Sequence, residues 1–130
     1  METGQISRLV QVGIRTLNDH QHAQAARFGV EIHHMRDLSG VAAISFDGPV
    51  YMSVDLDVLD PAFAPGVSHY EPGGLSTRQL LTMIQNIQVD LVGADLVELN
   101  PERDPAGISE MVAAKVLKEM IGLLHNSQGG

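Results

Sequence analysis

Four short runs of apolar residues have the pattern of buried β-strands. Val and Ile are frequent in them, and Gly29 and Pro49 precede the second and the third run. Continuous apolar runs of this length are typical of strands that are covered on both faces of a sheet. The predicted strands are Leu9–Ile14, Val30–His33, Val50–Asp55 and Leu91–Val97.

Between these runs, apolar residues recur with helical spacing. Residues Ala23–Phe28 have the pattern of a short helix. A longer helix is expected after Ser76, because Ser76 and Gln79 have the spacing of a capping box and four apolar residues follow on one helical face: Leu80, Leu81, Ile84 and Ile87. Asp104-Pro105 would start the last helix as N-cap and first-turn proline. The apolar face of that helix is formed by Ala113, Val116, Leu117, Met120, Ile121 and Leu124.

Strands that alternate with helices indicate parallel βαβ units and therefore an α/β layered fold. The link from the second predicted strand to the third holds about 16 residues, while a crossover needs a dozen or more, so a helix in this link must be small or absent. No repeat or linker divides the chain. The pattern predicts one domain over residues 1–125 and a disordered tail over residues 126–130.

The composition excludes several classes of function. Without Cys, the chain has no disulfide, no thiolate metal site and no Cys nucleophile. Its 16 Asp and Glu against 8 Lys and Arg give a net charge of −8, which would repel nucleic acids and anionic membrane surfaces. No apolar run approaches the roughly 20 residues of a membrane span, and the first residues lack the pattern of a signal peptide. An acidic chain suits cationic ligands or metal ions.

The third predicted strand runs into three carboxylates, Asp55, Asp57 and Asp60. Alternate residues of a strand point to the same side, so Asp55 and Asp57 would converge with their Cα atoms about 6.5–7 Å apart. Ligands of open parallel sheets bind at the carboxyl ends of strands, and two hard oxygen ligands there favour Mg²⁺ or Mn²⁺. The alternative is that this weak motif only ends a strand and caps a turn. Asp60 and Asp95 are expected to brace loops by hydrogen bonds.

A loop rich in Pro and Gly, Pro61–Gly74, follows the aspartates and is expected to form a pocket wall. His69 lies in this loop, either as a functional side chain or as a solvated one. Glu98 follows the fourth predicted strand and should lie at the same sheet edge as Asp55. There it could bind a guanidinium in bidentate fashion, or act only as a capping or solvated acid. The other His residues show no spacing typical of a ligand set.

Taken together, these motifs resemble a known family. The run SVDLDVLDPAFAPGVSHYEPGGLS, followed by VGADLVELNPERD, resembles the second half of the arginase/agmatinase (ureohydrolase) family. The segments SHYEPGG, NPERDPAGISEMVAAKVLKEM and VQVGIR are most similar to plant-type arginases and their bacterial agmatinase-like relatives. The resemblance extends from about Leu9 to Leu124.

The resemblance implies a three-layer α/β/α fold with a parallel, eight-stranded sheet, of which this chain would supply about the second half. It also implies a site for two Mn²⁺ ions, at which a hydroxide attacks the guanidinium carbon of a small cationic substrate, L-arginine or agmatine, and releases urea. By motif, Asp55 and Asp57 match the second pair of metal-bridging aspartates, and Glu98 matches the carboxylate that holds the substrate guanidinium. His69 lies in the pocket loop and would bear on specificity.

The family further implies a homo-oligomer, a trimer or a hexamer. The family does not fix the compartment: a cytoplasmic location is expected, or a mitochondrial one if the full-length protein is of the plant type. Arginine and polyamine metabolism are the implied processes.

The chain also departs from the family pattern. Four more metal ligands and a proton-shuttling His come from the family's first half, and neither its isolated His nor its Asp-x-His-x-Asp motif occurs in this sequence. Two carboxylates cannot saturate two octahedral ions. The sequence therefore indicates a C-terminal half, whether a fragment, a truncated product or a degenerate copy, that is inactive by itself.

Two other classes of function stay open besides a metal hydrolase in its full-length context. The chain could be a non-catalytic structural or interaction module. It could also be a haloacid-dehalogenase-like phosphotransferase, with Asp55 as nucleophile and Asp57 as acid. That third reading is disfavoured, because Leu59 stands where such enzymes have Thr or Val and the Pro-rich loop is foreign to them.

Overall fold

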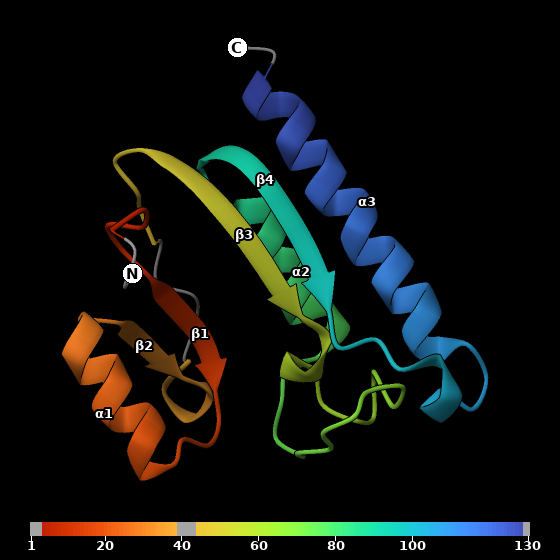
Figure 1. Ribbon diagram of the computed structural model, residues 1–130. Coiled ribbons are helices and arrows are strands. Elements are labelled where there is room, and N and C mark those ends of the chain that lie inside the picture. Colours follow the sequence, from red (N-terminus) through yellow and green to blue (C-terminus); the bar gives the residue numbers. More distant parts are fainter. Residues whose placement is uncertain (1–3, 39–43, 129–130) are drawn as a thin grey trace. The chain divides into compact units, whose positions relative to one another are not determined.

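A computed structural model describes residues 4–38 and 44–128 of the chain. The chain divides into two compact units, Met1–Gly40 and Val41–Gly130. Each unit has a sheet of two parallel strands with a helix in the connection between them (Figure 1). This is the parallel α/β arrangement that the alternation of strands and helices predicts.

The first unit contains a βαβ motif. Strand β1, Val10–Ile14, pairs with β2, Glu31–His34, and helix α1, Asp19–Phe28, connects them. The helix begins at Asp19 rather than at Ala23, because Asn18 and Gln21 form a capping box. The Gln21 N–H donates to Asn18 Oδ1 at 2.9 Å, and the Asn18 N–H donates to Gln21 Oε1 at 2.8 Å.

A short 3₁₀ turn, η1 over Met35–Asp37, follows β2. It is the helical element in the described part of the link to the third strand, where the sequence predicts a small helix or none. Residues 39–43 of this link lie outside the described residues.

The second unit packs two helices against its sheet. Strand β3, Pro49–Asp55, pairs with β4, Asp90–Val97. Helix α2, Thr77–Asn86, lies in the connection, and helix α3, Ile108–Gln128, packs on β4 and on α2 (Figure 1). Short 3₁₀ turns follow both strands: η2 over Leu56–Val58 and η3 over Pro101–Arg103. The core includes Val54, Leu56, Leu59, Leu80, Leu81, Ile84, Leu91, Val116 and Met120.

All four strands lie within one residue of their predicted bounds, but β3 is not covered on both faces as its apolar run suggests. Residues alternate along β3: Val54 is buried on the helix side, whereas Tyr51 is 62% exposed on the other side. The β3–β4 sheet therefore has one packed face and one exposed face.

Helix α2 confirms the predicted capping box. The Gln79 N–H donates to Ser76 Oγ at 3.2 Å, and the Ser76 N–H donates to Gln79 Oε1 at 2.9 Å. The predicted apolar face is buried at Leu80, Leu81 and Ile84. These residues anchor α2 in the core of the second unit.

Helix α3 begins at Ile108, three residues after the predicted first-turn proline, Pro105. Asp104, four residues before the start of the helix, still caps it, because its carboxylate accepts the Glu110 N–H at 2.9 Å. Leu117 and Ile121, which the pattern placed on the buried face, are 42% and 65% exposed because they lie at the border of that face. No helix among the described residues is long and apolar enough to span a membrane.

The end of α3 corrects the predicted tail. Residues 126–128 are helical rather than disordered, and residues 129–130 lie outside the described residues. Ser127 fastens this end of the helix to the start of β4: its Oγ accepts the Leu91 N–H at 3.1 Å and donates to the Val89 carbonyl at 3.3 Å.

Candidate metal and substrate site

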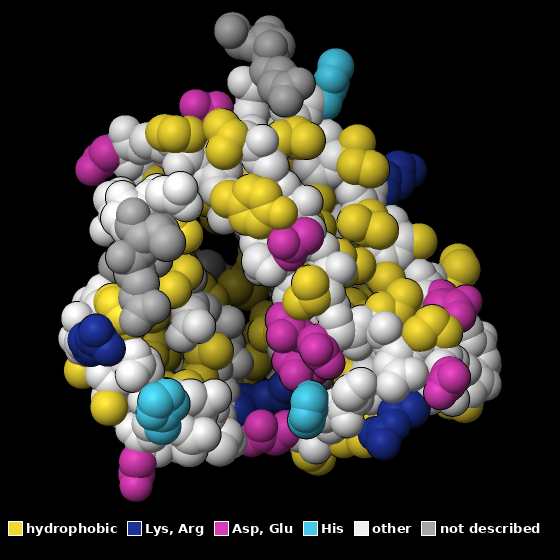
Figure 2. Space-filling model, viewed as in Figure 1, with side chains coloured by type: hydrophobic (Ala, Val, Ile, Leu, Met, Phe, Trp, Pro, Cys, Tyr) yellow, Lys and Arg dark blue, Asp and Glu magenta, His cyan; other side chains and the backbone are white. Residues whose placement is uncertain are grey.

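The carboxyl ends of β3 and β4 lie side by side (Figure 1). In their parallel register Asp55 is opposite Val97, so Glu98 is the residue directly after the partner of Asp55. This confirms the predicted shared edge of Asp55 and Glu98. Acidic side chains gather over this part of the sheet in the space-filling view (Figure 2).

The local geometry of Asp55 and Asp57 differs from the prediction. The strand ends at Asp55, and Asp57 lies in the turn η2, so the alternation of strand residues does not extend to Asp57. Asp55 caps this turn: its Oδ1 accepts the Asp57 N–H at 3.1 Å. The turn-capping alternative is thus realised, although a carboxylate that accepts one hydrogen bond retains lone pairs for a metal ion.

The donor types at this edge suit Mn²⁺, but their number does not. Asp55 is exposed and Asp57 is half-buried, and both offer the hard oxygen atoms that Mn²⁺ prefers. However, no group of three or more His, Asp or Glu within residues 4–38 and 44–128 could hold a metal ion. The described part of the chain therefore does not form a complete metal site.

Asp60 braces a loop, as the sequence predicts, whereas Asp95 braces the sheet instead. The Asp60 carboxylate accepts the N–H groups of Ala62 at 2.9 Å and Gly73 at 2.7 Å, which closes the loop Pro61–Gly74 on itself. Asp95 accepts hydroxyl groups from the neighbouring strand rather than from a loop. Tyr51 Oη donates to it at 3.0 Å and Ser53 Oγ at 2.5 Å.

His69 and Glu98 come together across the site. Nδ1 of His69 lies 3.8 Å from Oε2 of Glu98, which is an ion pair when the imidazole is protonated. The His69 side chain is 81% exposed and that of Glu98 is 37% exposed. The structure thus brings together the two residues that the sequence singled out for substrate binding.

Glu98 has an unusual backbone. Its φ of +66° lies in the left-handed region, which a residue with a Cβ adopts at an energetic cost. Strained conformations of this kind are concentrated at binding and catalytic sites. The strain at Glu98 marks the end of β4 as a candidate functional position.

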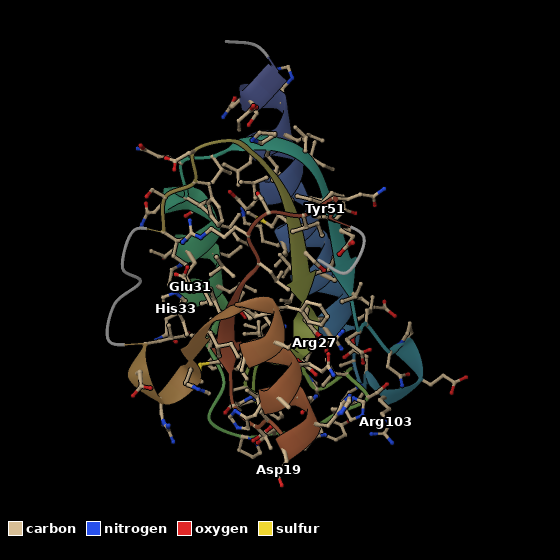
Figure 3. All side chains as sticks on the ribbon, turned by 60° about the vertical axis from the view of Figure 1, so that its left-hand side comes forward. Asp19, Arg27, Glu31, His33, Tyr51 and Arg103 are labelled. Carbon is tan, nitrogen blue, oxygen red and sulfur yellow. The ribbon has the colours of Figure 1, made fainter. Side chains whose placement is uncertain are left out.

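Sequence reasoning missed the residues that hold the pocket loop. The Asn100 N–H donates to the Gly66 carbonyl at 2.8 Å, and Asn100 Nδ2 donates to Ser68 Oγ at 3.1 Å. Arg103, which is labelled in Figure 3, donates from Nη1 to the Ser68 carbonyl at 3.1 Å. Its guanidinium lies over the Tyr70 ring. The available signal was the Pro-bounded charged segment 101–105 directly after a strand end.

A buried contact fixes the same loop to helix α3. Ser109 is fully buried, and its Oγ accepts the Gly66 N–H at 2.6 Å. A Cβ on Gly66 would lie 2.7 Å from Asp104 Cβ, so only Gly allows this approach. Burial raises the pKa of Asp104, but the helix amides of Glu110, Ser109 and Ile108 outweigh it and hold that pKa below its usual range. An ionised Asp104 therefore caps α3 beneath the loop.

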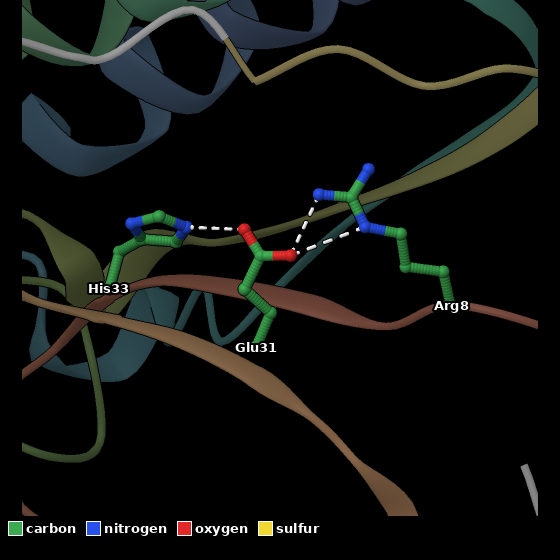
Figure 4. Close-up of polar contacts among 3 residues, drawn as sticks. All are labelled: Arg8, Glu31 and His33. Carbon is green, nitrogen blue, oxygen red and sulfur yellow. Dashed lines mark hydrogen bonds and ion pairs between the residues drawn. The ribbon is translucent and has the colours of Figure 1, made fainter.

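The first unit has a polar cluster of its own (Figure 4). Glu31 accepts hydrogen bonds from Arg8, at 2.7 Å from Nη2 and 3.2 Å from Nε, and its other oxygen lies 2.9 Å from His33 Nε2. The Arg8 and His33 hydrogen bonds lower the pKa of Glu31. The cluster joins β2 to the residues before β1.

Comparison with known proteins gives consistent findings. A sequence profile described as "Arginase family" matches residues 1–122. The chain is 49% identical to "Arginase 1, mitochondrial" of Arabidopsis thaliana, over 92% of this chain and 37% of that protein. It is 37% identical to "Agmatinase" of Chromobacterium violaceum, over 92% of this chain and 38% of that protein.

Solved structures of arginase and arginase-like proteins also resemble this chain. The arginase from Medicago truncatula superposes with a TM-score of 0.84 at 43% identity, over 95% of this chain and 42% of that one. A triple mutant of the Trypanosoma brucei arginase-like protein, solved with bound Mn²⁺, gives a TM-score of 0.87 at 32% identity over 92% of this chain and 43% of that one. The chain thus spans about 37–43% of the length of these proteins.

Proposed function

Because this chain belongs to the arginase family, we propose that it carries the guanidinium-binding part of a ureohydrolase site and two of the metal ligands. In a complete site the reaction would be hydrolysis of a guanidino compound, L-arginine or agmatine, to urea and an amine. The described residues alone do not hold a metal ion. The chain by itself is therefore proposed to bind substrate but not to turn it over.

The shared sheet edge carries this proposal. Register places Asp55 and Glu98 on adjacent strand ends, and the Glu98 carboxylate faces the pocket loop. A half-exposed carboxylate at such an edge can accept two parallel N–H groups of a planar guanidinium. We propose this role for Glu98, with His69 beside it.

The role proposed for Asp55 and Asp57 is to bind Mn²⁺ together with ligands from outside the described residues. A bound pair of Mn²⁺ ions would supply an activated water molecule. The chain's own contribution is to present two carboxylates at the end of β3, with Asp55 already fixed by its hydrogen bond to the Asp57 N–H.

A titration followed by NMR tests the substrate role. Agmatine and L-arginine should each shift a common set of amide signals around residues 68–70 and 98–100 in a saturable way. Putrescine, a dication without a guanidinium, should shift them far less. Glu98→Gln should weaken agmatine binding at least about tenfold, because the guanidinium loses the opposite charge and one of the two acceptor oxygen atoms that it would bind. The matched control is Glu102→Gln, which removes the same charge from an exposed residue.

Equal affinity of the wild type and Glu98→Gln for agmatine would refute the role of Glu98. Equal shifts with putrescine would show that the acidic surface attracts any cation. Either result would refute selective guanidinium binding at this edge, while the family membership and the role proposed for Asp55 and Asp57 would stand.

The second candidate is a non-catalytic interaction module, and it is favoured because residues 4–38 and 44–128 do not form a complete metal site. A urea assay with Mn²⁺ and either substrate distinguishes the two functions. We expect no urea above a control without enzyme. Urea release that is lost in Glu98→Gln would contradict this expectation and show that the chain itself completes a site.

The assembly and the compartment follow from the family as predictions. A homo-oligomer, trimeric or hexameric, is proposed, as is a cytoplasmic location or a mitochondrial one. The plant relative above carries "mitochondrial" in its name.

A further inference from the structure

Arg103 contacts both residues that flank His69. Its Nη1 donates a hydrogen bond of 3.1 Å to the Ser68 carbonyl, and its guanidinium carbon lies 5.4 Å from the centroid of the Tyr70 ring. A guanidinium is planar, so its face can stack on a ring while an in-plane N–H reaches a carbonyl. A lysine ammonium has no plane to stack on the ring, so it would not reproduce this geometry.

Both neighbours of His69 in the chain are in contact with Arg103, one through its carbonyl group and one through its ring. The His69 side chain is 81% exposed, so packing does little to orient it. Asn100 supports the same stretch through Gly66 and Ser68. Arg103 and Asn100 both belong to the segment that starts at Glu98, and their contacts therefore tie the two sides of the His69–Glu98 pair together.

We propose that Arg103 is a positioning residue, which fixes the backbone of Ser68–Tyr70 so that the His69 imidazole stays against the Glu98 carboxylate. Held there, His69 forms one wall beside Glu98 and limits the shape of the cation that can approach it. This consequence for substrate choice rests on the proposed function of Glu98. The placement of His69 by Arg103 does not, because it is a property of the unliganded chain.

The His69 ring signal in NMR spectra of the unliganded 130-residue chain tests the proposal. At one fixed pH, Glu98→Gln should shift the His69 Cε1–H resonance in the wild-type background. In the Arg103→Ala background, the same substitution should shift it by less than half as much. The backbone order parameter of His69 should also fall from about 0.85, typical of rigid backbone, to below about 0.6. Arg78→Ala, an exposed arginine of α2, is the matched control and should leave both values unchanged.

Three further variants separate positioning from a general effect on stability. The coupling between His69 and Glu98 is the shift of the His69 resonance that Glu98→Gln causes. Arg103→Lys and Tyr70→Leu each remove the stacked contact and should reduce this coupling as Arg103→Ala does. Tyr70→Phe keeps the ring and should retain it. If Arg103→Ala does not fold, as judged by the dispersion of its amide signals, Arg103→Lys and Tyr70→Leu decide the question.

Two results would overturn the proposal. One is a His69 resonance that does not respond to Glu98→Gln in the wild type, and the other is full coupling in the folded Arg103 and Tyr70→Leu variants. A failed agmatine titration with intact coupling would instead refute the role of Glu98 in substrate binding and leave the positioning by Arg103 supported.

Discussion

Ser53 Oγ donates a hydrogen bond of 2.5 Å to Asp95 Oδ1 across the two strands of the second unit. Tyr51 Oη donates to the other oxygen of the same carboxylate at 3.0 Å. Asp95 thereby links two residues of β3 on the exposed face of the sheet. Both hydrogen bonds require that the hydroxyl groups keep their protons.

This arrangement predicts an unusual tyrosine titration. The hydrogen bond to Asp95 raises the pKa of Tyr51, with a smaller contribution from burial. Because the folded-state pKa lies above the unfolded value of about 10, the bond stabilises the fold below about pH 10 and this contribution is lost as the pH rises through the folded-state pKa. Ultraviolet titration should show one of the two tyrosines ionising above the usual range.

Asp95→Asn should return that tyrosine to an ordinary pKa, because the negative charge that opposes ionisation is gone. Asp90→Asn, at the other end of β4, serves as the control and should leave the titration unchanged. A high-pKa tyrosine that persists in Asp95→Asn would contradict the assignment.

Manganese binding should be weak. Two carboxylates on a turn offer too few ligands for a tight site, so calorimetry should give a dissociation constant in the millimolar range or weaker, an order-of-magnitude expectation. Asp55→Asn combined with Asp57→Asn should abolish the heat signal. The double variant Asp47→Asn with Asp90→Asn removes the same charge elsewhere and should not. Submicromolar affinity would mean that further ligands complete the site.

Gly74 lies close to the backbone of Leu59 and Asp60, so a larger residue at position 74 should cause a packing defect. A Cβ there would lie 2.5 Å from the Asp60 nitrogen and from the Leu59 carbonyl carbon, which are backbone atoms that cannot move aside easily. Gly74→Ala should therefore lower the free energy of unfolding by about 1–3 kcal/mol in urea titrations. Gly122→Ala is the comparison, because a Cβ there has open space and Ala favours the helix. Equal stability of the two variants would contradict this prediction.

The isolated chain should associate. Within the described residues, β3 and β4 pair only with each other, and Val92 on β4 is 59% exposed. Open strand edges of this kind invite pairing with another chain. Sedimentation velocity should show dimers or larger species, and Val92→Lys should reduce them more than Thr82→Lys, an exposed position of α2. A wild type that stays monomeric with a sharp thermal transition would count against the prediction.

The strands could be predicted because an apolar run of strand length leaves few alternatives, and because Gly29 and Pro49 mark the start of two of the four runs. The capping box of α2 was equally readable, since Ser76 and Gln79 precede an apolar face. That of α1 was not, because its first turn is polar and offers no periodicity to mark a helix. Local sequence patterns therefore located the strands and helices that contain periodic or continuous apolar residues.

The site could be predicted only in part. Shared strand ends placed Asp55 and Glu98 together, as parallel topology requires. The turn at Asp57 was one of two readings of the motif, because the sequence does not show whether strand geometry continues past Asp55 or gives way to a turn. The hold of Arg103 on Tyr70 joins residues far apart in the chain, and no local pattern encodes such a pair.

Because the backbone of Glu98 is left-handed, the residue that would best stabilise the fold at position 98 differs from the one proposed to bind guanidinium. Glycine would relieve the strain there, and it would also delete the carboxylate proposed to meet the substrate. Selection of variants for heat resistance alone would therefore favour Gly at position 98 and, in the same step, discard the proposed recognition of guanidinium. A screen meant to improve this scaffold would have to score ligand binding alongside melting temperature.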